Sequence, residues 1–336
     1  MSDNDWMNAP RLLIEAELKP VAGNRFQPTG FADLGAAEYQ LPGGMSMLLV
    51  ESAQSVANRL EQTCLDGTGP EIDPVLVGLP YIVGELTGGP MGTVRTSSLM
   101  EAHRMASPYF LLNKKFQDQI AEEMGYNPKR PLNWNKIYAT LFKYDPNSLI
   151  HGVFLSLLEG GRVRTPRAVT GFIEASDVKR VVSGGVKNSP VDPTGKLQVA
   201  EAKAGGEKGV YSNVPYTRVE YVAATITAYF NVDLSLIRGY QLGEAATKLL
   251  TSLALLKIRR FLSSHLRLRT ACDLELAGAI MVKSPKHFAL HDEATLLEDV
   301  TKGIAACAAQ FAAPPVTLII TPVKIVEKPE KPGASA

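Results

Sequence analysis

Cysteine and long apolar runs are both scarce in this sequence of 336 residues, and each shortage excludes a class of protein. The three cysteines, Cys64, Cys272 and Cys307, are widely separated and odd in number, so neither a disulfide framework nor a cysteine-based zinc site is predicted. The longest apolar segment, residues 314–323, is far shorter than the ~18 residues of a membrane-spanning helix. The N-terminus is acidic and lacks the pattern of a signal peptide. We therefore predict a cytoplasmic protein with no membrane partner.

Motifs for nucleotide binding and catalysis are missing as well. The sequence has no Walker-type phosphate loop and no Gly-x-Ser-x-Gly elbow, and the glycines of residues 88–92 lack dinucleotide-binding spacing. His287 and His291 are four residues apart and could ligate a metal ion from one helix face, but without a third ligand a surface pair is the favoured interpretation. We predict a binding protein that is not an enzyme and uses no cofactor or metal.

Charge is distributed unevenly along the chain, although the net charge is only +1. Residues 1–105 carry 6 Lys and Arg against 13 Asp and Glu, residues 106–269 carry 23 against 13, and residues 270–336 carry 6 against 8. Three explanations remain open for this asymmetry: an anionic partner along the middle of the chain, pairing of opposite ends between copies, and ordinary solvated surface.

The periodicity of apolar residues predicts an α+β fold. Strands are expected at residues 11–18, 48–50, 75–83, 164–174, 216–230, 277–282 and 316–323, and helices at 53–64, 114–124, 133–144, 243–264 and 293–311. The simplest plan with this order is an elaborated ferredoxin-like βαββαβ fold, with an insertion at 84–150 and a long exposed loop or hairpin at 182–214. The tail at 327–336 is predicted to be disordered.

Candidate nucleic-acid contacts come from cations and flat groups, which single-stranded RNA requires. Arg162 and Arg164 are expected on a strand edge, where they serve either RNA or protection against aggregation. The loop at 23–31 offers charge, hydrogen bonds and two phenylalanines on a glycine-rich backbone. Its chemistry alone favours an ordinary structural loop.

Five segments, at 23–35, 51–61, 208–216, 233–239 and 266–273, together resemble a known family. They are similar, in this order, to segments of the CRISPR-associated backbone subunit of type I-U (I-G) systems, which belongs to the Cas-seven family of the repeat-associated mysterious protein superfamily. The resemblance extends from about Arg11 to Val323. It is more specific than any single motif because five motifs occur in the same order.

The resemblance implies a right-hand-shaped subunit that binds guide RNA (crRNA). Its palm, with an RNA-recognition-type (RRM-like) fold, would comprise residues 10–83, 151–181 and 215–325; its helical fingers would be residues 84–150 and its thumb hairpin residues 182–214. The expected RNA-binding residues are Asn24, Arg25, Gln27, Thr29, Gln54, Asn58, Arg59, Arg162, Arg164, Lys208, Tyr211 and Ser212.

The family also implies partners. Copies of the chain would line up as a helical filament along one crRNA in a Cascade surveillance complex for antiviral defence. A large subunit, a fused guide-processing and cap subunit, target DNA paired to the guide and a recruited helicase-nuclease would complete the system. The alternative is a metal-dependent ribonuclease that uses Asp33, because type III relatives cut RNA with an aspartate in a comparable loop. Ala32 and Leu34 favour a buried or turn-capping Asp33 instead.

Overall fold

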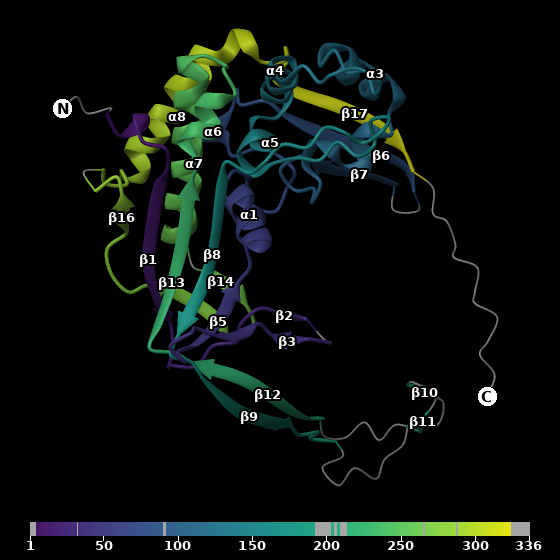
Figure 1. Cartoon of the computed structure of the whole chain (residues 1–336). Helices are drawn as coiled ribbons and strands as arrows, with labels where there is room; N and C mark the ends of the chain where they lie inside the picture. The colour runs from purple at the N-terminus through teal and green to yellow at the C-terminus, as the bar shows by residue number, and fades with distance from the viewer. Residues whose placement is uncertain are drawn as a thin grey trace.

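The chain forms an α+β structure in which helices cover one side of a curled antiparallel sheet (Figure 1). The computed structural model describes residues 5–31, 33–89, 92–191, 203–204, 207–208, 214–264, 266–286 and 288–323. The predicted tail at 327–336 lies outside these residues. No helix within them is long and apolar enough to cross a membrane.

The main sheet has eight antiparallel strands in the order β14-β15-β1-β13-β8-β5-β4, with β16 also paired to β1. They are β1 (Leu12–Pro20), β4 (Glu38–Gln40), β5 (Ser46–Glu51), β8 (Val169–Ser176), β13 (Thr225–Val232), β14 (Leu266–Arg269), β15 (Cys272–Leu276) and β16 (Met281–Ser284). Two helices pack with these strands: α1 (Ala53–Gln62) follows β5 in the chain, and α7 (Glu244–Ser263) precedes β14. Because β1, α1, β8, β13, α7 and β15 follow one another and the strands lie side by side as β15-β1-β13-β8, the topology is compatible with the predicted βαββαβ plan.

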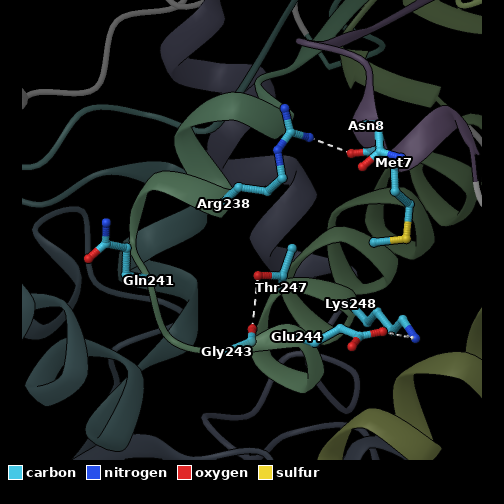
Figure 2. Close-up of a pocket in the computed structure, with 8 residues that line it drawn as sticks. All are labelled: Met7, Asn8, Arg238, Gln241, Gly243, Glu244, Thr247 and Lys248. Atoms are coloured by element: carbon cyan, nitrogen blue, oxygen red, sulfur yellow. Dashed lines mark hydrogen bonds and ion pairs between the residues drawn. The ribbon is translucent and has the colours of Figure 1, made fainter.

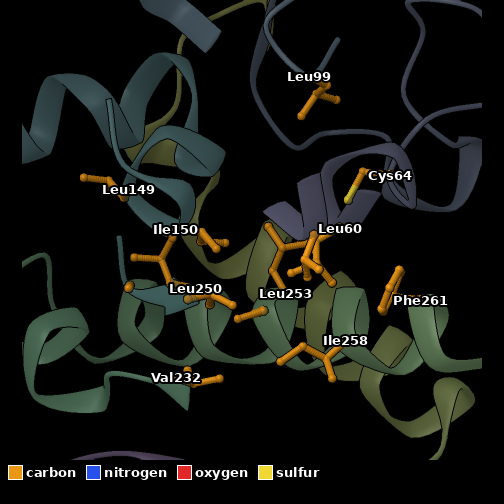
Figure 3. Close-up of a cluster of buried hydrophobic side chains, with 14 of the residues drawn as sticks. Leu60, Cys64, Leu99, Leu149, Ile150, Val232, Leu250, Leu253, Ile258 and Phe261 are labelled. Carbon is orange, nitrogen blue, oxygen red and sulfur yellow. The ribbon is translucent and has the colours of Figure 1, made fainter. Parts of the chain in front are cut away.

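Alternation along the strands gives the main sheet one buried and one open face. On β1, Ile14 and Ala16 are buried, whereas Glu15 and Glu17 point to the other side. The buried face packs against α1 and α7, whose apolar side chains fill the core (Figure 3). Leu253 and Phe261 of α7 belong to this core, as the apolar pattern of residues 243–264 predicted.

A second, three-stranded sheet and most of the remaining helices lie beside the main sheet (Figure 1). Its order is β17-β6-β7, where β17 (Val316–Pro322) is parallel to β6 (Tyr81–Gly89) and β7 (Gly92–Ser97) is antiparallel to it. The other helices are η1 (Asp5–Asn8), η2 (Pro74–Leu76), η3 (Arg104–Ala106), α2 (Pro108–Leu111), α3 (Lys114–Glu123), α4 (Trp134–Tyr144), α5 (Pro146–His151), α6 (Leu234–Gly239), α8 (Glu293–Cys307) and η4 (Ala308–Gln310).

A two-stranded ribbon projects from one end of the main sheet (Figure 1). It pairs β9 (Lys179–Lys187) with β12 (Val214–Val222), and two-residue breaks separate these strands from β8 and β13. Five short pairings complete the described chain: β2 (Gly30–Phe31) with β3 (Gly35–Ala36), β10 (Lys203–Ala204) with β11 (Glu207–Lys208), and the isolated bridges Phe26–Tyr221, Leu65–Ile72 and Phe154–Arg164.

Four predicted strands have different bounds in the structure. The strand expected at 216–230 is two strands because the chain breaks at Ala223 and Ala224, and the one expected at 164–174 begins only at Val169. The strand expected at 75–83 was wrong in its first half, because Pro74 starts the 3-10 helix η2 and β6 begins after Pro80. Residues 277–280 precede β16, and the strands β7, β14 and β15 were not predicted.

Charged residues are buried where α5 meets α1, η3 and α7. The Arg104 guanidinium donates to both carboxylate oxygens of Glu61, at 2.6 and 2.7 Å, and to the carbonyl of Gly152 at 3.2 Å. Lys257 contacts the side-chain oxygen of Asn147, and its Nζ is 3.0 Å from Nε2 of His151. All of these side chains are less than a tenth exposed. The contacts therefore fix four separate elements to one another.

Replacing Arg104 with alanine should destabilise the fold strongly, because Glu61 would remain buried without its partner. We expect a loss of about 3–5 kcal/mol in the free energy of unfolding, measured by urea denaturation. The exposed Lys114→Ala is the control and should change stability by less than about 0.5 kcal/mol. Equal stability of the two variants would contradict the structural role of this pair.

The His151→Gln variant should change how stability depends on pH. Burial, with the nearby charges of Lys257 and Arg104, holds the pKa of His151 well below 6.5, so the unfolded chain takes up a proton that the folded chain does not. The stability that neutral His151 contributes is complete above pH 6.5 and is lost as the pH falls below it, by up to ~1.4 kcal/mol per pH unit. The pKa values of Glu61 and Asp145 are raised by burial in the wild type and in the variant alike, so they do not account for a difference between the two. Unfolding free energies between pH 7 and pH 5 should therefore fall more steeply for the wild type than for the variant, and parallel curves would contradict this.

Candidate nucleic-acid interface

A groove of about 800 Å³ lies between the segment that follows β1 and the ribbon, along most of the length of β12. One wall comes from residues 27–30 and the turn between β2 and β3, and the other from Arg180 on β9 and residues 216–219 on β12. Arg269, at the end of β14, also lines it. Segments more than 200 residues apart in the sequence thus meet at one site.

Backbone hydrogen bonds and one buried side chain hold the loop after β1 in place. Phe26 is 1% exposed, and its N–H and carbonyl both bond to Tyr221, at 2.9 Å each. The N–H of Gln27 donates to Ala271, and that of Thr29 donates to Val50. The loop is therefore fixed to β12, β5 and the turn between β14 and β15, while the side chains of Gln27 and Thr29 stay half-exposed in the groove.

Glu51 organises the cations on one side of the groove. Its carboxylate is 1% exposed and is contacted by Ser55, by Nε of Arg59 at 3.3 Å and by the guanidinium of Arg269. Arg269 also donates to the carbonyls of Gln27 and Val50, at 3.1 Å each. Burial lowers the pKa of Arg269, yet its guanidinium keeps these acceptors and lines the groove. The guanidinium of Arg269 therefore lines the groove in a fixed orientation.

The ribbon contributes cations that are held less tightly. Arg180 is exposed and forms no ion pair within the described residues. The guanidinium of Arg218 is 5.8 Å from the ring centre of Tyr216 and 3.9 Å from the Glu220 carboxylate. Tyr216 itself is about half exposed. Arg180, Arg218 and Tyr216 thus present charge and an aromatic face to solvent, the combination that single-stranded nucleic acid needs.

Asn24 and Arg25 of the predicted set lie in an adjacent hollow of about 380 Å³ and not in the groove. Arg25 is 3.2 Å from the carboxylate of Glu220, which also accepts a 2.7 Å hydrogen bond from Ser183. Glu220 is 7% exposed, so Arg25 neutralises a buried carboxylate. Asn24 is exposed at the rim.

The predicted residues of α1 divide between two faces of the helix. Ser52 caps it by accepting from the N–H of Ser55, which fixes its start. Gln54 and Asn58 are exposed, one turn apart. Arg59 turns away from them toward Glu51 and donates to the carbonyls of Arg267 and Leu268. Burial lowers the pKa of Arg59, and its contacts serve the fold.

Arg162 and Arg164 lie on an irregular segment before β8, so their predicted place on a strand edge was wrong. Arg162 donates to the carbonyls of Pro128 and Arg130, at 2.8 Å each. Arg164 stacks on Phe154, with 4.4 Å between the guanidinium carbon and the ring centre. Neither residue lines the groove.

Several other predictions fall on or near the residues that are not described. Tyr211, Ser212 and His287 lie outside the described residues, and for Lys208 the backbone pairing of β11 is described. Asp33 is exposed in the turn between β2 and β3, so the buried alternative was wrong, and the turn-capping alternative stays a prediction. Among the described residues, no three His, Cys, Asp or Glu side chains are placed to share a metal ion.

Sequence reasoning missed Arg180, Arg218, Tyr216 and Arg269 as groove residues. Lys179 and Arg180 were adjacent cations at the start of the predicted hairpin, and Arg269 belonged to a resembling segment. The alternation of Tyr216 and Arg218 on one strand was a further signal. Only the tertiary pairing of β9 with β12 brings these residues beside Gln27 and Thr29.

A second hollow, of about 630 Å³, lies at the start of α7 (Figure 2). Its cations are already partnered: Arg238 donates to the carbonyls of Met7 and Ala9, and Lys248 is 2.7 Å from Glu244. The groove beside the ribbon is therefore the better candidate for an anionic ligand.

Comparison with known proteins gives one family and distant structural neighbours. The profile of the family described as CRISPR-associated protein GSU0053 matches residues 12–180. A solved chain described as "CRISPR RNA-guided surveillance complex, pre-nicking" is 13% identical, with a TM-score of 0.39, and the match covers 79% of this chain and 76% of that one. Csc2 of Thermofilum pendens is also 13% identical, with a TM-score of 0.32 and coverage of 92% and 80%. No curated protein matches the sequence.

Replacing Glu51 with glutamine should lower the unfolding free energy by about 2 kcal/mol or more, because the hydrogen bonds of Arg59 and Arg269 lose their charged acceptor. The exposed neighbour Asn58→Ala is the matched control on α1 and should leave stability within about 0.5 kcal/mol of the wild type. Urea unfolding measures both. A fully stable Glu51→Gln protein would show that this carboxylate does not hold the groove together.

Proposed function

The chain belongs to the CRISPR-associated protein GSU0053 family, and on this premise we propose that it is a non-catalytic backbone subunit that binds the guide RNA of a surveillance complex. The observation that carries the proposal is the groove beside the ribbon. It combines arginines, hydrogen-bonding side chains and an exposed tyrosine along a single path.

The chemistry of the groove suits the RNA backbone rather than particular bases. Arg180, Arg218 and Arg269 supply cations for phosphates, and Thr29 and Gln27 supply hydrogen bonds. Tyr216 offers a ring on which any base can stack. A subunit that must accept many guide sequences needs contacts of this kind, because base stacking and phosphate contacts depend little on the RNA sequence.

The proposed architecture follows the hand described for the resembling family. The palm would be RRM-like, with residues 10–83, 151–181 and 215–325, and the strand order β15-β1-β13-β8 supports this assignment. Residues 84–150 would be the fingers, and residues 182–214, which include the outer part of β9 but only Val214 of β12, would be the thumb. Copies would line up along one crRNA, contact the other Cascade subunits and present the guide to target DNA.

The predicted RNA-binding residues receive different roles in this proposal. Gln27 and Thr29 would contact the guide in the groove, and Asn24, Gln54 and Asn58 are exposed and free to extend the path. Arg25 and Arg59 would hold the walls of the groove in place through their ion pairs, Arg25 with Glu220 and Arg59 with Glu51. Lys208, Tyr211 and Ser212 stay predictions for the thumb. Arg162 and Arg164 would meet the guide only if it passed the helical insertion.

The ribonuclease alternative receives no support from the surroundings of Asp33. Its side chain is exposed in a turn, and the described residues contain no group of three His, Cys, Asp or Glu side chains that could hold a metal ion with it. Incubating the protein with guide, matched target RNA and divalent metal tests this directly, and cleavage that Asp33→Ala abolishes would establish the nuclease.

The double variant Arg180→Ala, Arg218→Ala should bind a guide-length RNA more weakly by about 1–3 kcal/mol, because two phosphate contacts are lost. The slope of log affinity against log salt should fall by about 2. Fluorescence anisotropy at several salt concentrations measures both quantities.

Lys302→Ala on α8 is the control for that measurement, since it removes an exposed cation far from the groove. Its affinity and salt dependence should equal those of the wild type. Unchanged binding by the double variant would place the guide elsewhere, and a wild-type protein indifferent to RNA would refute the proposed function.

A further inference from the structure

The open face of the main sheet has a chemistry opposite to that of the groove. In the strand register, Glu15 of β1, Tyr229 of β13 and Phe172 of β8 form one row, and Glu17, Thr227 and Glu174 form the next. Tyr229 and Phe172 stack with their ring centres 5.3 Å apart, and both are partly exposed. An aromatic pair therefore lies beside three carboxylates on a surface that no described element covers.

Two of these carboxylates form no ion pair within the described residues. Glu15 is 3.2 Å from Lys283, which neutralises it. Glu17 forms no ion pair within the described residues, and Glu174 accepts only a 2.6 Å hydrogen bond from Tyr39. Burial and the Glu174 carboxylate raise the pKa of Tyr39 to about 12, so Tyr39 stays a neutral donor. The centre of the face is thus negative.

This charge argues against RNA as the occupant of the face. Although aromatic side chains on an open sheet suit stacked bases, each nucleotide also carries a phosphate. Glu17 and Glu174 would repel phosphates that approach from either side of Thr227. A cationic protein surface suits the same arrangement, because arginine and lysine pair with carboxylates and pack against aromatic rings.

The chain itself carries such a cationic surface, on the second half of its helical insertion and the segment that follows it. Residues 125–169 have seven Lys and Arg against two Asp and Glu, and Asp145 is one of those two and is buried. Lys129, Arg130, Lys136, Arg162 and Arg164 are exposed, and none forms an ion pair within the part of the chain that the structure describes. Arg162 bonds to the carbonyls of Pro128 and Arg130, which brings this end of the surface together.

We propose that the open face around Glu17 and Glu174 docks the basic surface around Lys129 and Arg130 of a second copy of this chain. The two surfaces lie on different elements of one molecule, so the contact is head-to-tail, and copies that follow one guide would extend it into an open array. The inference rests on the proposed function in that it supplies the contact between successive copies along a guide. It assigns the basic surface of the insertion to a neighbouring subunit.

A charge-swap experiment tests the contact. The variants E17K/E174K and K129E/R130E each give the two surfaces the same sign, and E298K/D299K on α8 is the matched charge-reversal control. Self-association is measured for nuclease-treated protein at low salt by analytical ultracentrifugation. Copies per long guide are counted by mass photometry.

We expect each surface variant alone to associate at least tenfold more weakly than the wild type, and the control to associate normally. A 1:1 mixture of the two variants should recover assembly, because every interface then joins opposite charges. The fourfold variant E17K/E174K/K129E/R130E should assemble alone, because its two surfaces again carry opposite charges. Normal assembly of E17K/E174K, or no recovery in the mixture, overturns the proposal, as does a wild type that stays monomeric both free and on a long guide.

Affinity for a short RNA that fits one copy separates this inference from the proposed function. Both surface variants should bind it within twofold of the wild type. If K129E/R130E loses short-RNA binding and the mixture does not recover assembly, the basic surface binds nucleic acid and the docking proposal fails. If charge-swap recovery holds but the wild type binds no RNA, the docking contact stands and the proposed function fails.

Discussion

A carboxylate can be buried only if cations and hydrogen-bond donors surround it, and Glu51 meets this requirement with residues from two other parts of the chain. Arg59 approaches from α1 and Arg269 from the end of β14. Because Arg269 also holds the carbonyls of Gln27 and Val50, the loop after β1 is tied to β5 through the same charge. The shape of the groove wall therefore follows from a single buried negative group.

The distribution of partners separates two kinds of arginine in this protein. Arg25, Arg59, Arg104 and Arg269 satisfy acids that folding has buried, whereas Arg180, Arg162 and Arg164 form no ion pair in the part of the chain that the structure describes. The first kind specifies how elements meet, and the second kind is left to bind something outside the chain. A net charge of +1 conceals this division, because it counts internal and external charges alike.

Apolar periodicity predicted the longer elements that bury one face, and missed short strands whose exposed positions are charged. The pattern of residues 243–264 identified α7, and that of residues 11–18 identified β1. The hairpin of β14 and β15 was missed because Arg267, Arg269 and Asp273 interrupt its apolar residues, although the alternation of Leu266 and Leu268 was present. A composition rich in Val, Thr and Tyr predicted one strand at 216–230 and gave no sign of the break at Ala223.

The sequence indicated where the candidate site lies better than it indicated what each residue does there. The segment at 23–35 does form one groove wall, because its Gly, Pro and polar residues mark a loop that must leave β1. The assignment of Arg59 to RNA overlooked Glu51, which is eight residues away and faces it only once β5 and α1 have packed. Arg180 and Arg218 depended on a strand pairing that no local pattern specifies.

The ribbon is a direct continuation of the hairpin formed by β8 and β13, interrupted on both sides by only two residues. The joint is held by the N–H of Ala224, which donates to Ser176, and by the 2.7 Å contact between the hydroxyls of Ser176 and Thr225. Nine residues of strand extend ~30 Å, so the ribbon acts as a lever arm, and residues along most of β12, from Tyr216 to Tyr221, line the groove. A tilt of about 10° at the joint would displace its tip by ~5 Å while the residues at its base moved far less. Distance from the joint therefore sets how far each residue of the ribbon can reach.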